Sequence, residues 1–235
     1  MNHSRFWEID FIRGIAIIMM IIYHFIFDLN YFKFINVSMS SGFLGIFQKI
    51  IAISFITLVG ISLTLASSKK NLSGIIKKGL LILGLGFVIT IITLIFVQDS
   101  PVYFGILHLI GTSVVLSVIF LKSFKLNIIL GILSIFIGNI LSKIIINFPW
   151  FLPFGVKYKG FSSLDYFPLF PWFGFVLIGI FIGKILYKNN QRNFSIVEEP
   201  INLRLIELLG KKSLLIYMIH QPIIISILYL IKLIK

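Results

Sequence analysis

Four ionisable side chains on the first long apolar run are the first candidates for chemistry. Asp10, Arg13, His24 and Asp28 lie at its start or within it, where an ionisable group costs free energy and therefore usually faces a protein interior or a wet cavity. Arg13 and His24 are eleven residues apart, which places them on one helix face, about 16 Å apart along its axis. Asp10 and Asp28 extend this face by one turn at each end. The spacing predicts a polar track along one helix.

This track suits an extended anionic ligand whose reactive end lies deep in the membrane. The guanidinium of Arg13 could bind phosphate or carboxylate groups, and the imidazole of His24 could act as general base, general acid or acyl carrier. The carboxylate of Asp28 is then expected to orient the His24 ring. For Arg13 alone, the alternative that it only marks the inner membrane surface stays open.

Two more histidines, His108 and His220, stand in apolar runs and are further catalytic candidates. Each has a structural alternative. Pro222 frees a backbone carbonyl near Met218, so His220 and Gln221 could instead satisfy that local disruption. His108 is expected near the outer end of its helix, where hydration is cheap.

We expect no metal site, because the three internal histidines belong to different apolar runs and no HExxH pair occurs. The chain also lacks a phosphate-binding Gly-Lys-Ser/Thr loop and a dinucleotide fingerprint. Basic side chains would therefore have to bind any nucleotide-bearing ligand.

The composition excludes a water-soluble globular enzyme. The chain is 58% hydrophobic and 12% charged, against roughly half and a quarter in soluble domains, and its mean hydropathy is +1.06. Without cysteine it can form neither disulfides, thiolate metal sites nor cysteinyl acyl intermediates. The net charge of +13 is attributed to membrane orientation, and no nucleic-acid partner is expected.

The elements that position these residues are predicted to be transmembrane helices, since only helices satisfy the backbone of such segments in lipid. Seven apolar runs are long enough, at residues 11–32, 43–67, 79–97, 102–121, 126–146, 166–187 and 213–234. We therefore expect an all-α, polytopic protein with about seven transmembrane helices, which forms one domain over residues 1–235 in the lipid bilayer of the cell membrane. The larger share of Lys and Arg falls on the side that holds the N-terminus, which predicts a cytoplasmic N-terminus.

Two connections are long. The inner one, at about 188–212, is most simply a cytoplasmic linker. The outer one, at 147–165, is rich in aromatic residues and is interpreted as an interfacial belt, with a lid over a cavity as the alternative. Gly179 and Gly183, four residues apart, are expected to let helices approach closely.

Five segments, in order along the chain, resemble a known family. They are residues 5–16 with His24 eight residues later, 55–63, 105–111, 167–174 and 215–222. Together they are similar to the small prokaryotic members of the heparan-alpha-glucosaminide N-acetyltransferase catalytic family, within the transmembrane acyltransferase group. The spacing of Arg13 and His24 also resembles that in membrane O-acyltransferases that decorate bacterial polysaccharides.

The resemblance implies a multi-pass acetyltransferase that takes acetyl-CoA from the cytoplasmic side and acetylates a saccharide or glycolipid on the extracytoplasmic side. His24, Asp28, His108 and His220 are then the catalytic candidates. The donor-binding candidates are Arg13, Asp10, Lys69 and Lys70. This chain lacks the extra spans and the luminal domain of the lysosomal member, so its acceptor stays open, as do O- or N-transfer, a ping-pong or ternary order and a homo-oligomeric state.

Two other classes of function are compatible with the residues. A small proton-coupled transporter would also place His24, Asp28, His108 and His220 along a wet pathway. A non-catalytic partner subunit would only present helices to a larger complex, and it should lose nothing on His24→Ala.

Overall fold

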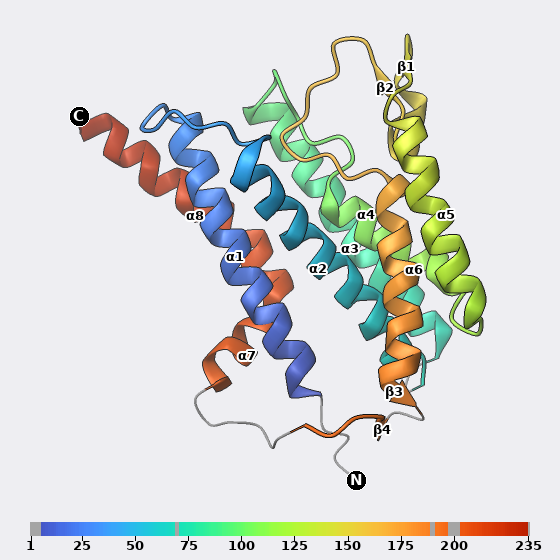
Figure 1. Cartoon of the computed structure of the whole chain (residues 1–235). Coiled ribbons are helices and arrows are strands. Elements are labelled where there is room, and N and C mark those ends of the chain that lie inside the picture. The colour runs from blue at the N-terminus through green and yellow to red at the C-terminus, as the bar shows by residue number, and fades with distance from the viewer. Residues whose placement is uncertain (1–5, 69–70, 189–190, 197–202, 235) are drawn as a thin grey trace. The chain divides into compact units, whose positions relative to one another are not determined.

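The computed structural model describes residues 6–68, 71–188, 191–196 and 203–234. It is mostly helical (Figure 1), as predicted. The helices are α1 (Trp7–Tyr31), α2 (Gly42–Ser67), α3 (Leu72–Phe96), α4 (Ile106–Ser117), α5 (Lys125–Leu141), the 3-10 helix η1 (Pro149–Phe154), α6 (Leu169–Leu186), α7 (Arg204–Lys211) and α8 (Ser213–Ile234). Four two-residue strands form a parallel pair, β1 (Ile145–Ile146) with β2 (Lys157–Tyr158), and an antiparallel pair, β3 (Tyr187–Lys188) with β4 (Gln191–Arg192).

Five helices within the described residues are long and apolar enough to cross a membrane: α1, α2, α3, α6 and α8. They correspond to five of the seven predicted runs. The other two runs contain α4 and α5, which have 12 and 17 residues. At 1.5 Å per residue these helices are about 18 Å and 26 Å long, shorter than a hydrocarbon core of about 30 Å.

The predicted span at 102–121 is shortened at both ends. Residues 118–121 form turns, and the first residues of the span are extended and not helical. Phe104 forms a parallel bridge with Tyr166, and its carbonyl accepts a hydrogen bond from the Phe167 amide at 2.9 Å. The carboxylate of Asp165 then accepts the amide proton of Ile106 at 2.9 Å. This contact caps α4 and makes it begin at Ile106.

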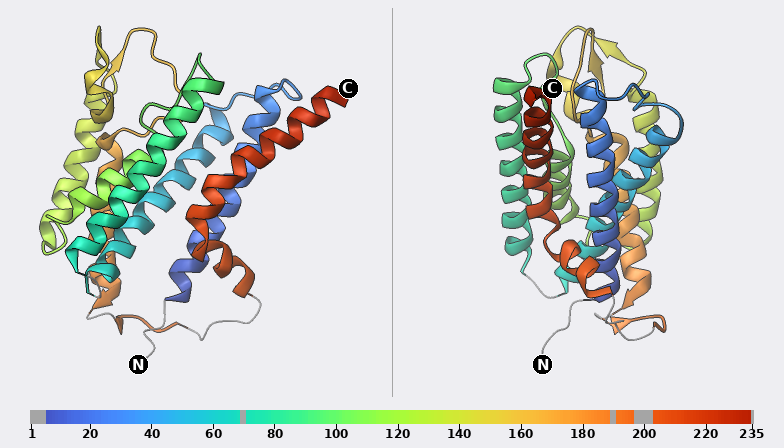
Figure 2. Two further views of the ribbon diagram at one scale, coloured as in Figure 1. Left: turned by 180° about the vertical axis from the view of Figure 1, so that it is seen from behind. Right: turned by 90° about the vertical axis from the view of Figure 1, so that its left-hand side faces the viewer.

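The chain divides into two compact units. The first comprises residues 1–55 and 196–235, and the second comprises residues 56–195, so that the boundary lies within α2. In the first unit, α8 runs along α1, and α7 folds against the first turns of α1 (Figure 2). The core of this unit is formed by Ile17, Met20 and Tyr23 of α1 and Ile51 of α2, with Ile216 and Tyr217 of α8 packed against it.

Glycines set the close approach of α1 and α7. A Cβ atom on Gly14 would clash with the backbone carbonyl of Ile206, and one on Gly210 would clash with the carbonyl of Asp10. The two backbones are therefore in direct contact, which holds the polar first turns of α1 against α7.

The second unit is built from helix pairs that also meet at glycines. In the pair of α5 and α6, a Cβ atom on Gly131 would lie 3.0 Å from the carbonyl of Gly174. The prediction for Gly179 and Gly183 is confirmed, because Cβ atoms there would meet the backbone of Thr57 and Ile61 on α2. Such contacts let helix backbones approach closely in lipid.

The outer connection presents an aromatic surface. Trp150 of η1 is 79% exposed, and Phe148, Phe151 and Phe154 are exposed as well. Exposed rings at the end of the apolar helices favour the interfacial belt over the lid. In the inner connection, β3, β4 and α7 are described, whereas Glu198, Glu199 and Pro200 lie outside the described residues.

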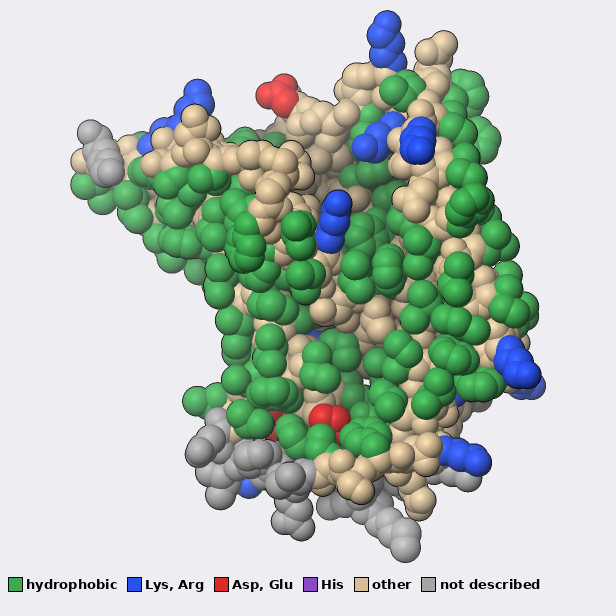
Figure 3. All heavy atoms as spheres, in the orientation of Figure 1, with side chains coloured by type: hydrophobic (Ala, Val, Ile, Leu, Met, Phe, Trp, Pro, Cys, Tyr) green, Lys and Arg blue, Asp and Glu red, His purple; other side chains and the backbone are tan. Residues whose placement is uncertain are grey.

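Hydrophobic side chains cover the flank of α5 that Figure 3 shows. Ile129, Ile132 and Phe136 of this helix are exposed. An apolar flank of this kind suits contact with lipid.

Candidate active site

Two of the predicted catalytic histidines lie side by side in the first unit. The rings of His24 on α1 and His220 on α8 have centroids 4.8 Å apart and planes inclined by 73°. His220 is 6% exposed, whereas His24 is only partly buried. The helix pairing therefore brings one shielded and one more accessible imidazole together.

Both rings use Nδ1 in a hydrogen bond to a backbone carbonyl. Nδ1 of His24 lies 2.9 Å from the Met20 oxygen, and Nδ1 of His220 lies 2.7 Å from the Tyr217 oxygen. A carbonyl can only accept, so in each case Nδ1 carries the proton and Nε2 keeps its lone pair. Nε2 of His220 is buried without a hydrogen-bond partner among the described residues. An imidazole in this tautomer can act as a base or a nucleophile through Nε2.

Asp28 lies in the same unit but has a different partner from the one predicted. Its carboxylate, 2% exposed, accepts a hydrogen bond from Nε2 of Gln221 at 3.2 Å. The carbonyl of Met20 holds the His24 ring instead. Helical spacing correctly placed Asp28 one turn beyond His24, but the carboxylate bonds to α8.

From the sequence, Gln221 is expected only to satisfy the backbone near Pro222. In the structure its side chain connects α8 to α1 beside the two histidines. The sequence feature that indicates such a contact is an amide side chain next to a histidine inside an apolar run. The backbone carbonyl bonded by His220 is that of Tyr217, one residue before the position expected from Pro222.

The predicted anion-binding end of the track already contains an ion pair. Nη1 of Arg13 lies 2.7 Å from the Asp10 carboxylate, and both side chains are largely buried. On α7, Glu207 forms a salt bridge with Lys211. An anionic ligand at Arg13 would therefore have to share the guanidinium with Asp10. The other donor-binding candidates, Lys69 and Lys70, lie outside the described residues.

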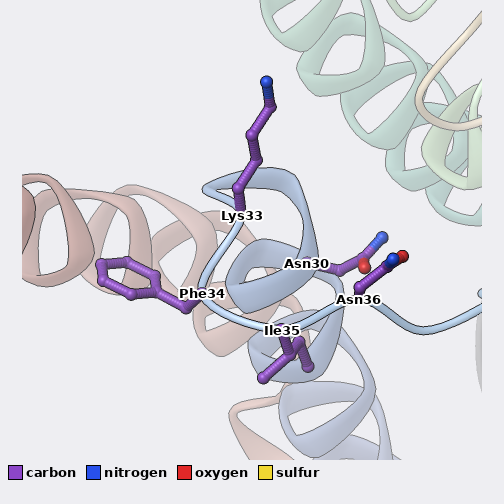
Figure 4. A pocket seen from close by; sticks show the side chains of 5 residues that line it. All are labelled: Asn30, Lys33, Phe34, Ile35 and Asn36. Atoms are coloured by element: carbon purple, nitrogen blue, oxygen red, sulfur yellow. The ribbon is translucent and has the colours of Figure 1, made fainter.

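An open hollow of about 510 Å³ lies where α1 ends, just beyond Asp28 in sequence (Figure 4). It is lined by Asn30, Lys33, Phe34, Ile35 and Asn36. The side chains of Asn30 and Asn36 point in the same direction, whereas those of Lys33 and Phe34 point away from them. Lys33 adopts a left-handed conformation with φ 64°, a cap that turns the chain sharply after the helix.

His108 lies in the second unit, where its hydrogen bonds are complete. Nδ1 accepts the Gly105 amide proton at 3.2 Å, so Nε2 carries the proton, and it lies 3.3 Å from the Thr90 hydroxyl. Thr90 in turn donates to the Val102 carbonyl at 2.6 Å. The ring is 1% exposed and packs edge-on against Phe87. This arrangement favours a structural role, and the catalytic role of His108 stays a prediction.

Asp165 completes the same region by capping α4. Burial raises the pKa of its carboxyl from 3.8 to about 6, while the hydrogen bond from the Ile106 amide acts in the opposite direction. The burial effect is the larger. Near neutral pH the Asp165 carboxylate is therefore charged, and the burial of this charge lowers the stability of the folded protein.

Within the part of the chain that the structure describes, no three His, Asp or Glu side chains are grouped as metal ligands. Comparison with protein families gives a match over residues 5–222 to the family described as heparan-alpha-glucosaminide N-acetyltransferase, catalytic. No curated protein and no solved structure matches the chain.

Proposed function

Because the chain belongs to the heparan-alpha-glucosaminide N-acetyltransferase catalytic family, we propose that it is an integral, multi-pass acetyltransferase of the cell membrane. It takes acetyl groups from acetyl-CoA on the cytoplasmic side and delivers them to a saccharide or glycolipid on the other side. Membership of the family implies an acyltransferase and gives no support to the transporter hypothesis. The donor, the acceptor and the sidedness belong to the proposal.

The observation that carries the proposal is the pair of Nδ1-protonated imidazoles on α1 and α8. An acyl transfer needs a group that accepts a proton or an acyl group at its lone pair. His24 suits this role because its side chain is partly accessible while the Met20 carbonyl fixes its tautomer.

In a direct transfer, Nε2 of His24 takes the proton of the acceptor O–H or N–H group as that oxygen or nitrogen bonds to the acetyl carbon. The carbon–sulfur bond breaks, and the imidazolium returns the proton to the departing thiolate, which leaves as CoA. In a ping-pong route, Nε2 would itself hold the acetyl group before the acceptor arrives. His220 lies beside His24 in either case, and His108 would act only if its closed hydrogen bonds opened.

We propose that Arg13 binds the CoA phosphates and gives up part of its contact with Asp10 when it does so. A guanidinium has five N–H donors and can serve more than one anion. Thermal stability of the purified protein should rise with acetyl-CoA and CoA but not with ATP. Arg13→Lys, which keeps the charge and loses the planar fork, should weaken this shift; an unchanged shift would remove Arg13 from the donor site.

The proposal is tested with the purified protein in lipid vesicles, acetyl-labelled acetyl-CoA and an envelope glycolipid extract. We expect label in the glycolipid fraction together with an equal amount of released CoA, and neither with His24→Ala. Mass analysis after acetyl-CoA alone separates the two routes, because only the ping-pong route leaves an acetylated protein. Solute flux driven by a pH difference, without CoA release, would contradict the proposal and favour a transporter.

A further inference from the structure

Three buried polar atoms beside His24 lack partners among the described residues. They are Oδ2 of Asp28, Oε1 of Gln221 and Nε2 of His220. Asp28 is on α1, and the other two residues are adjacent on α8, where Gln221 already bonds to Asp28. We call Asp28, His220 and Gln221 the acceptor array, because of the chemistry of these three atoms.

Each of the three atoms can accept a hydrogen bond. An ionised carboxylate oxygen has only lone pairs. The Gln221 side chain directs its NH₂ group to Asp28, which leaves the carbonyl oxygen on the other side of the amide. His220 has its proton on Nδ1, so Nε2 holds a lone pair.

A buried hydrogen-bond acceptor without a partner lowers the stability of the folded protein, because it has lost its hydrogen bonds to water. Natural structures contain few such groups, and those that occur usually serve a function or hold water or a ligand. Within an apolar helix pair there is no bulk water to satisfy them. Three such atoms, on residues that are bonded to each other or adjacent in sequence, therefore indicate a binding site for a group that donates hydrogen bonds.

We infer that the acceptor array binds the hydrogen-bond-donating head group, a hydroxyl or an amine, of the molecule that receives the acyl group. This inference rests on the proposed function. The array offers lone pairs, whereas the thioester carbonyl and the phosphates of acetyl-CoA also present lone pairs and need donors. The thioester carbonyl and the phosphates of acetyl-CoA are therefore not the groups that these three atoms bind. A hydroxyl can donate to one of these atoms at a time, and an ammonium group to all three. A head group held here would lie beside His24, whose ring centre is 4.8 Å from that of His220, and in the transfer its proton would pass from the array to Nε2 of His24.

Gln221 is a positioning residue in this arrangement. Its contact with Asp28 sets the orientation of its amide, and that orientation makes Oε1 an acceptor. Specificity then follows from the cost of leaving buried polar atoms unpaired, since a ligand without a donor cannot satisfy them.

The test uses four probes with the same octyl tail: octanol, octylammonium, octyl methyl ether and octanoate. Thermal unfolding of the whole protein is followed in phosphatidylcholine nanodiscs without acetyl-CoA. We expect octanol or octylammonium to raise the midpoint by about 3 °C more than the ether and octanoate do. The larger of the first two shifts distinguishes a hydroxyl from an amine ligand.

Gln221→Met, which keeps the length of the side chain, should abolish the preference for donor heads. Asp28→Asn, which keeps the shape of the side chain, should reduce this preference as well. The second variant keeps the test valid if Gln221→Met does not fold. Gln48→Met, on α2 in the same unit, is the matched control and should retain the preference. Equal shifts from octanol, octylammonium and the ether would mean that the array holds only water, and would overturn the inference.

The kinetic readout separates this inference from the proposed function. With an acceptor that turns over, Gln221→Met should raise the KM for the acceptor about tenfold and leave the KM for acetyl-CoA unchanged. An equal change in both constants would overturn the inference while the transferase function stands. A donor-head preference without any acetyl transfer would overturn the proposed function instead.

Discussion

The histidines of the two units have opposite hydrogen-bonding arrangements. In the first unit, His24 and His220 direct N–H groups to their own helix backbones and keep their Nε2 lone pairs. In the second unit, Nδ1 of His108 accepts a hydrogen bond from the Gly105 amide, and its protonated Nε2 faces the Thr90 hydroxyl. All three stand in apolar runs, so burial alone does not mark a reactive residue. The difference is the lone pair that remains, because a base or nucleophile needs one.

The largest effect that tests this comparison is the loss of activity in His24→Ala. We expect acetyl transfer to fall by about 10²–10⁴-fold, the usual contribution of a positioned base. Thermal unfolding should change little, because the ring makes its hydrogen bond within its own helix. Activity assays on vesicles with equal amounts of folded protein measure this change. Retained activity would remove His24 from the chemistry.

His108→Ala should have the reverse profile. Its removal leaves the Gly105 amide without a partner, takes one of two hydrogen bonds from the Thr90 hydroxyl and opens a cavity, so the free energy of unfolding should fall by about 2–4 kcal/mol. Activity per folded molecule should be kept. Denaturant or thermal unfolding in detergent gives the first value. A loss of activity as large as in His24→Ala, at unchanged stability, would contradict the comparison and restore His108 as catalytic.

Because Asp165, which caps α4, is buried, we expect stability to depend on pH, with an effect of intermediate size. Its pKa is raised in the folded state to about 6, so the folded protein holds this proton more tightly than the unfolded chain does. Its contribution to stability is therefore full below pH 3.8 and is lost as the pH rises through 6. Across this range stability should fall by about 2–3 kcal/mol. Asp165→Asn should flatten this part of the unfolding profile, and an unchanged slope would show that another group is responsible.

The smallest predicted effect compares two glycines of α3. A Cβ atom on Gly86 would lie 3.0 Å from Nδ1 of His108, whereas one on Gly84 would meet no atom within 4 Å. Gly86→Ala should lower the free energy of unfolding by about 1 kcal/mol, because the ring is held on both sides. Gly84→Ala should be neutral or stabilise by about 0.5–1 kcal/mol through its helix propensity. Equal effects in thermal unfolding would show that the His108 ring can move.

Much of the site could be predicted from local spacing. The turn that separates His24 from Asp28, and the turn that pairs Asp10 with Arg13, follow directly from helical periodicity. The contact of Asp28 with Gln221 spans 193 residues of sequence, and no local pattern encodes such a pairing. The start of α4 cannot be predicted from local patterns for the same reason, because it depends on Asp165, which lies 59 residues after Ile106.

The all-α class, the apolar helices and the family follow from the amino-acid sequence alone, because hydropathy and short motifs are properties of neighbouring residues. The tertiary structure decided which histidine keeps a reactive lone pair. That choice depends on which donors and acceptors reach each ring nitrogen: a helix carbonyl for His24 and His220, and an amide with a threonine hydroxyl for His108. Hydrogen bonds act over about 3 Å, so only the folded chain can assign them.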